Sequence, residues 1–120
     1  MLQIIFSQVS ARELAVMPHQ LQIELLDDFQ VLPADFEKEN DKFGVLTRAG
    51  KKIYRYRVKD YRIYFEKKDG LINVLCILNK NSLKDFFYRT KLPISEDQLL
   101  QENPKFWQLL DSGTTPSKRP

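Results

Sequence analysis

Arginines and tyrosines alternate along the middle of the chain in a pattern suited to phosphate chemistry. The stretch Ile53–Val58 carries Arg55 and Arg57 at alternate positions, and residues two apart share one face of an extended strand. Arg62 and Tyr64 follow at the same spacing, so all four side chains are expected on one open sheet face. Arginines bind phosphate bidentately and stabilise charge developing on it, while tyrosines can stack on unpaired bases. A strand face that is merely kept soluble by its charges is the open alternative.

Charge is distributed unevenly along the chain. Residues 22–41 hold seven acids against one base, whereas residues 42–91 hold fourteen Lys and Arg against four acids. The net charge of +3 conceals this asymmetry, which bears on partners rather than on fold. The basic half favours a polyanion or an acidic protein as partner, and an unevenly charged, solvated surface is the alternative.

Composition disfavours several classes of site. One histidine and one cysteine are too few for the usual zinc sites, and the four glycines form no phosphate-binding loop. A magnesium site on Asp27 and Asp28 stays open, but acids on a helix usually form a solvated face. We therefore expect no metal and no cofactor.

The lone Cys76 lies among apolar residues and is expected to be a buried thiol in a reducing compartment. No apolar run approaches the roughly 20 residues of a membrane span. The start of the chain lacks the basic and apolar segments of a signal peptide. These features predict a soluble, cytoplasmic protein with no membrane partner.

Changes of hydrophobic period along the 120 residues predict one α+β domain. The expected elements are a strand at 2–6, helices at 11–17 and 18–29, a loop at 33–42, strands at 53–58, 61–65 and 71–78, and helices near 83–89, 95–100 and 106–110. Ser10 and Glu13 would form a capping box, and Asp69-Gly70 would close a tight hairpin. This predicts an N-terminal helical hairpin packed on a twisted antiparallel sheet of three to four strands, with C-terminal helices. The domain would span 1–111 (core 2–90, extra helical segment 94–111), before a disordered tail at 112–120.

The stretch LTRAGKKIYRYRVKDYRIYF, residues 46–65, resembles the core of the RelE/ParE toxin superfamily. Its Arg-Val-x-Asp-Tyr-Arg segment is the most specific part, and the similarity extends over about residues 2–89. The resemblance implies a helical hairpin packed on a twisted sheet with a concave basic face, and a role as translational repressor in a toxin–antitoxin system. RelE-like members enter the ribosomal A site and cut messenger RNA without metal, by attack of the ribose 2′-OH on its own phosphate.

The resemblance also assigns roles to single residues. Arg55 and Arg57 match the family's basic pair, and Arg62 matches the arginine that stabilises the transition state. Tyr88 matches the tyrosine near the 2′-OH, as base or orienting group. Further basic and aromatic side chains are expected to bind RNA: Lys52, Lys59, Tyr64, Lys80 and Lys84. The implied partners are the ribosome and messenger RNA, and a cognate antitoxin is left open.

Two features keep other functions open. The segment after the last strand offers Lys80 and Lys84 but neither the arginine nor the histidine that many RelE-like toxins carry there. The extra segment 94–111 could cover the basic face or dock a partner, although burial of Trp107 in the protein's own core is favoured. The alternatives are therefore a non-catalytic protein that binds ribosome, RNA or an acidic partner, and a ParE-like gyrase inhibitor.

Overall fold

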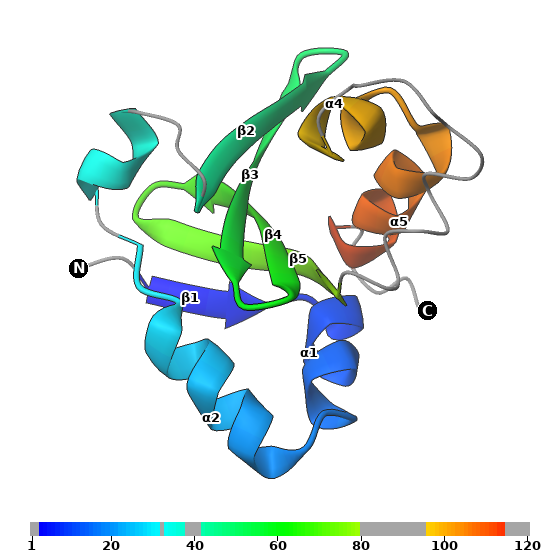
Figure 1. Cartoon of the computed structure of the whole chain (residues 1–120). Helices are drawn as coiled ribbons and strands as arrows, with labels where there is room; N and C mark the ends of the chain where they lie inside the picture. The colour runs from blue at the N-terminus through cyan, green and yellow to red at the C-terminus, as the bar shows by residue number, and fades with distance from the viewer. Residues whose placement is uncertain (1–2, 32, 38–41, 80–95, 115–120) are drawn as a thin grey trace, which may run out of the picture.

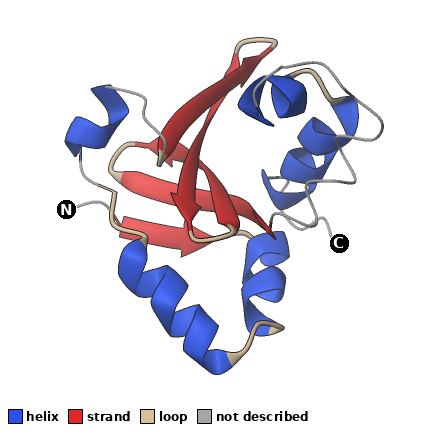
Figure 2. Ribbon diagram, viewed as in Figure 1, coloured by secondary structure: helices blue, strands red, loops and turns tan. Residues whose placement is uncertain are grey.

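A computed structural model describes residues 3–31, 33–37, 42–79 and 96–114. They form a mixed α+β fold in which helices flank one five-stranded sheet (Figure 1 and Figure 2). The elements are β1 (Gln3–Phe6), α1 (Gln8–Ala15), α2 (His19–Asp28), a 3-10 helix (Pro33–Glu37), β2 (Phe43–Arg48), β3 (Lys51–Val58), β4 (Tyr61–Lys68), β5 (Leu71–Asn79), α4 (Glu96–Gln101) and α5 (Pro104–Thr114). The predicted α+β class is confirmed. None of the described helices is long and apolar enough to cross a membrane.

The strand order is β1-β5-β4-β3-β2, and β2 to β5 form an antiparallel meander. Two-residue turns join these strands, and each begins with a residue at positive φ: Ala49 at 51°, Lys59 at 54° and Asp69 at 44°. Tight hairpin turns require this conformation because it matches the twist of the flanking strands. The hairpin predicted at Asp69-Gly70 is therefore confirmed.

The sheet is larger than the sequence predicted. The three central strands and the N-terminal edge strand are present, but β2 adds a fifth. Its sequence FGVLTR has no clear alternation, and it exists because it pairs with β3 over its whole length, from Phe43 opposite Tyr56 to Arg48 opposite Lys51. In addition, β1 runs parallel to β5, so the sheet is not wholly antiparallel.

The N-terminal helices also differ from the prediction. Ser7 caps α1, since its Oγ accepts a hydrogen bond from the Ser10 N–H at 3.1 Å, and the predicted capping box of Ser10 and Glu13 is wrong. α1 and α2 follow β1 and diverge as a V rather than packing as an antiparallel hairpin (Figure 1). They diverge because α2 packs Leu25 and Phe29 into the core on one face, whereas α1 lies along β5.

Apolar clusters bury both faces of the sheet. The first holds α2 against β3 and β4 and includes Phe29, Val58 and Phe65. The second holds α4 and α5 against the opposite face and includes Phe106 and Trp107. β5 contributes to both clusters, as expected for a strand covered on both sides. Burial of Trp107 in the protein's own core is likewise confirmed.

Polar side chains of α1 complete the hydrogen bonding of β5 where β1 ends. The last pair of the two strands is Phe6 opposite Val74. Beyond it, the Ser10 hydroxyl donates to the Val74 carbonyl at 2.8 Å, and the Ser7 hydroxyl donates to the Leu75 carbonyl at 2.9 Å. The Ile77 N–H donates to the carboxylate of Glu13 at 2.8 Å. Because unpaired buried backbone groups are costly, these three hydrogen bonds hold α1 at the edge of the sheet.

Burial makes Glu13 hard to ionise. Its carboxyl borders a cavity of about 290 Å³ that Tyr61 and Asn79 also line. Removal from water raises the pKa of Glu13 from 4.5 to about 7, and the hydrogen bond from Ile77 opposes this only in part. The pKa of the buried Cys76 thiol is also raised, first by burial and then by the charge of Glu13. Since the folded protein holds the Glu13 proton more tightly than the unfolded chain, this residue's contribution to stability falls as the pH rises from 4.5 to about 7.

We expect Glu13→Gln to remove this pH dependence. The whole shift corresponds to about 3 kcal/mol, which solvent screening of a partly exposed carboxyl reduces to about 1–2 kcal/mol. The free energy of unfolding of the variant should equal that of the wild type below pH 4.5. At alkaline pH it should be higher by about 1–2 kcal/mol. Urea unfolding across this pH range measures the difference. Glu24→Gln is the control, because Lys59 lowers the pKa of that carboxyl; a Glu13 variant that is less stable at every pH would contradict the argument.

Candidate nucleic-acid interface

Cross-strand pairing places three arginines and a tyrosine on one face of the sheet. On the neighbouring antiparallel strands β3 and β4, Arg55 lies opposite Tyr64 and Arg57 lies opposite Arg62. Side chains of directly opposite residues point to the same face. The grouping predicted from the sequence spacing is therefore present.

That face is covered, not open. α4 and α5 pack against it (Figure 1). Tyr64 has no exposed surface, and its ring meets Phe106 edge to face with 5.0 Å between the ring centroids. The prediction of an open face was wrong because the face also carries apolar side chains, among them Leu46 and Ile53, which are buried with α5. A Tyr64 ring in this position does not reach an RNA base.

Arg55 lies beneath α4 in a partly buried ion pair. Its Nε donates to both carboxylate oxygens of Asp97, at 3.0 and 3.1 Å, and the Arg55 side chain is only 8% exposed. Taking a charge out of water is costly unless a counter-ion and hydrogen bonds replace the water. Asp97 therefore neutralises the cation that the sequence analysis had assigned to RNA chemistry. That analysis missed Asp97 because it took residues 95–100 only for a helix.

A glycine in β2 makes room for this ion pair. A Cβ added to Gly44 would lie 2.6 Å from the Asp97 Oδ2 and even closer to the Arg55 guanidinium. Any other residue at this position would displace one partner of the pair. Gly44 thus explains why the alternation of β2 is interrupted at this point in the sequence.

Arg57 and Arg62 form the remaining cationic pair of the face. Both lie two positions from the β3–β4 turn; Arg62 is buried and Arg57 is half-buried. The Nε of Arg57 is buried and has no hydrogen-bond partner within the described part of the chain. Like charges opposite one another on neighbouring strands repel, and partial exclusion of water strengthens the repulsion. A phosphate at the half-buried Arg57 could accept hydrogen bonds from its guanidinium, with the buried Arg62 adding positive charge next to it.

The predicted RNA-binding lysines do not gather around this pair. Lys52 alternates with Arg55 on β3, so it points to the opposite face, where its ammonium lies 5.7 Å from the Tyr54 ring centroid. Lys59 lies in the β3–β4 turn close to the arginines in sequence, and its ammonium pairs with Glu24. Lys52 and Arg55 are an odd number of positions apart, so the sequence alone could have shown that they point to opposite faces of the sheet.

Three candidate residues lie outside the described residues: Tyr88, Lys80 and Lys84. Their part in the site stays a prediction. Within the described ranges, no three His, Cys, Asp or Glu side chains are grouped as a metal ion would require.

Comparisons with known proteins find little similarity to this chain. No family model matches it, and no curated protein matches its sequence. Among solved structures, a chain of the RelB–RelE antitoxin–toxin complex from Methanococcus jannaschii is 20% identical, with a TM-score of 0.42. The match covers 69% of this chain and 98% of that chain. Likeness at this level establishes neither the family nor the function of the present protein.

Loss of the Asp97 charge should destabilise the fold. Asp97→Asn would leave the buried Arg55 without its counter-ion, and breaking such a pair on one side costs about 2–4 kcal/mol of unfolding free energy. Asp111→Asn is a matched control, since its ion pair with Lys51 has the Asp111 side chain 62% exposed and should contribute at most about 1 kcal/mol. Chemical unfolding of the two variants compares them directly. Equal losses would show that Arg55 does not depend on Asp97.

Proposed function

We propose that this chain is an RelE-like toxin, a translational inhibitor that cuts messenger RNA on the ribosome. The observation that carries the proposal is the directly opposed pair Arg57 and Arg62. Two guanidinium groups held together on a rigid sheet make a receptor for a phosphate group. The resemblance of residues 46–65 to the RelE/ParE toxins supports messenger RNA as the source of that phosphate, and ribosomes as the setting.

The proposed reaction needs groups that stabilise negative charge. The ribose 2′-OH attacks the adjacent phosphorus, and the bond from phosphorus to the 5′-oxygen of the next nucleotide breaks. The 2′-OH loses its proton and the leaving 5′-oxygen gains one, which leaves a 2′,3′-cyclic phosphate and a 5′-hydroxyl. Arg57 and Arg62 would bind the phosphorane-like transition state, whose charge exceeds that of the bound phosphate. The resemblance gives Tyr88 the place near the 2′-OH, as base or orienting group.

Arg55 has a positioning role in this proposal. Its bond to Asp97 ties β3 to α4, and the same strand carries Arg57. The phosphate is therefore assigned to Arg57 and Arg62 alone, although the family resemblance assigns a role at the phosphate to Arg55 as well. Lys59, in the adjacent turn, is paired with Glu24 and is not assigned to the phosphate.

A non-catalytic binding protein is the second candidate. The observation in its favour is that Tyr64 is buried under α5 and Arg55 is held by Asp97, so two residues expected to contact RNA are occupied within the fold. Such a protein would hold ribosome, RNA or an acidic protein on Arg57 and Arg62 without cutting RNA.

Purified ribosomes and a translated messenger RNA provide the test. We expect the wild type to cut the message at the A-site codon and Arg62→Ala to lose about 10²–10³ in rate, the usual effect of removing one charge-stabilising group. Primer extension maps the cuts. Arg62→Lys retains the charge but not the bidentate geometry and should recover only part of the activity.

Lys67→Ala serves as the control, because Lys67 lies near the other end of β4 with its ammonium over the Phe36 ring. Circular dichroism verifies that each variant is folded. Intact message with the protein still bound to ribosomes would favour the non-catalytic binder. Absence of ribosome binding would reject the nuclease and a binder of ribosomes, and would direct the test to inhibition of gyrase supercoiling and to protein partners.

A further inference from the structure

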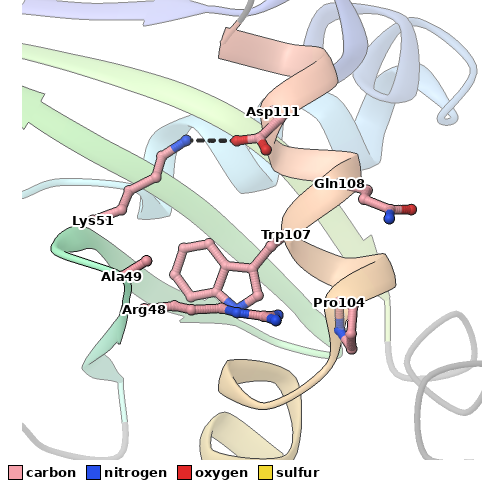
Figure 3. A pocket seen from close by; sticks show the side chains of 7 residues that line it. All are labelled: Arg48, Ala49, Lys51, Pro104, Trp107, Gln108 and Asp111. Carbon is pink, nitrogen blue, oxygen red and sulfur yellow. Dashed lines mark hydrogen bonds and ion pairs between the residues drawn. The ribbon is translucent and has the colours of Figure 1, made fainter.

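A second cationic site lies at the opposite end of the same sheet face. The β2–β3 turn and α5 enclose a cavity of about 360 Å³ (Figure 3). The strand side contributes Arg48, Ala49 and Lys51, and the helix side contributes Pro104, Trp107, Gln108 and Asp111. The cavity is large enough for a group the size of a nucleoside.

Its aromatic wall is held in place before any ligand arrives. The Trp107 Nε1–H donates to the Gln101 carbonyl at 2.9 Å, and the Gln101 side chain accepts from the Thr47 N–H at 2.9 Å. These bonds fix the indole between α4 and β2. Most of the ring is buried, with the residue 6% exposed, and the part at the cavity wall costs little further ordering when a planar ligand packs against it.

Positive charge lies next to this ring. Arg48 is exposed, borders the cavity beside the indole (Figure 3) and has no ion pair with any described residue. Lys51 also borders it, with its ammonium 2.8 Å from an Asp111 oxygen in an exposed ion pair that a competing anion can replace at little cost. Gln108 adds an exposed amide that can donate or accept. An aromatic wall, two cations and an amide are the groups that recognise a base, its phosphate and a polar base edge.

We propose that this cavity binds one nucleotide of a single-stranded RNA, with the base against the small part of Trp107 that lines the cavity (the residue is 6% exposed) and the phosphate on Arg48 and Lys51. Lys51 and Arg57 are six residues apart on β3 and point to the same face, a separation of about 20 Å. The cavity would therefore hold the RNA at a distance from the phosphate bound at Arg57 and Arg62. The identity of the ligand as RNA rests on the proposed function, whereas binding of a free nucleotide does not.

Trp107 is the one tryptophan of the sequence, so its fluorescence reports on this cavity. Adenosine 5′-monophosphate and a short oligoadenylate are added to the full-length protein without ribosomes, with excitation where tyrosine does not absorb. We expect saturable quenching by both, and weaker binding of adenosine, which lacks the phosphate. Arg48→Ala should weaken the affinity for the nucleotide by about tenfold or more.

Two further variants make the test specific. Lys105→Ala removes one exposed charge from α5 outside the cavity and should leave the affinity within about twofold. Asp111→Asn should raise the affinity, because it releases Lys51 and removes a negative charge from the wall. Absence of quenching by either probe, or quenching that Arg48→Ala leaves unchanged, would overturn the proposal. Ribosome-dependent cleavage together with no quenching would reject only the cavity, and quenching without cleavage would retain the cavity and reject the nuclease.

Discussion

Packing of α4 and α5 onto the second face of the sheet is the interaction on which the rest of the structure depends. Leu100, Phe106 and Leu110 are fully buried there, and three such side chains contribute roughly 5–9 kcal/mol before the cost of ordering the chain. Arg55 lies on the covered face and is buried with them. Its charge then requires Asp97, and the pair in turn requires the space left by Gly44. One apolar contact thus dictates a helix position, an ion pair and a glycine.

The size of this contribution argues that the cover is permanent. Lifting α5 would expose Phe106 and Leu110 together with Tyr64 beneath them, at a cost comparable to the whole stability of a typical domain. The RNA binding that we propose would therefore have to use the residues that the helices leave uncovered at their margins. β3 illustrates the division, because Arg55 belongs to the covered part while Arg57 lies nearer to the turn. The apolar core beneath α4 and α5 leaves charged side chains available for binding only near the ends of this sheet face.

Local features of this fold were predictable from the sequence, and the long-range ones were not. Alternation with a period of two predicted β3 and β4, and the Asp69-Gly70 turn predicted the start of β5. Both signals depend only on residues adjacent in the sequence. The pairing of Arg55 with Asp97 spans 42 positions, and nothing in the residues around Asp97 distinguishes it from any other acid at the start of a helix. Glu13 was likewise taken for a local cap, whereas its carboxylate accepts from Ile77 across the fold. The grouping of the arginines was predictable from their alternate spacing. That α4 and α5 would cover them was not, since the apolar residues of these helices do not specify which sheet face they will bury.

The charge asymmetry of the sequence is largely internal to the folded molecule. The acidic helix α2 faces the basic half, where Glu24 pairs with Lys59 and Asp28 with Lys42. Arg55 and Lys51 are balanced by acids of the C-terminal helices. A polyanion responds mainly to cations that the fold has not already neutralised. Among the described residues Arg57 and Arg48 are cations of this kind, without an ion pair, and they lie toward opposite ends of the β2–β3 hairpin. On the described part of this sheet face, the fold leaves these two cations far apart, and the proposed affinity for RNA would depend on their spacing as well as on net charge.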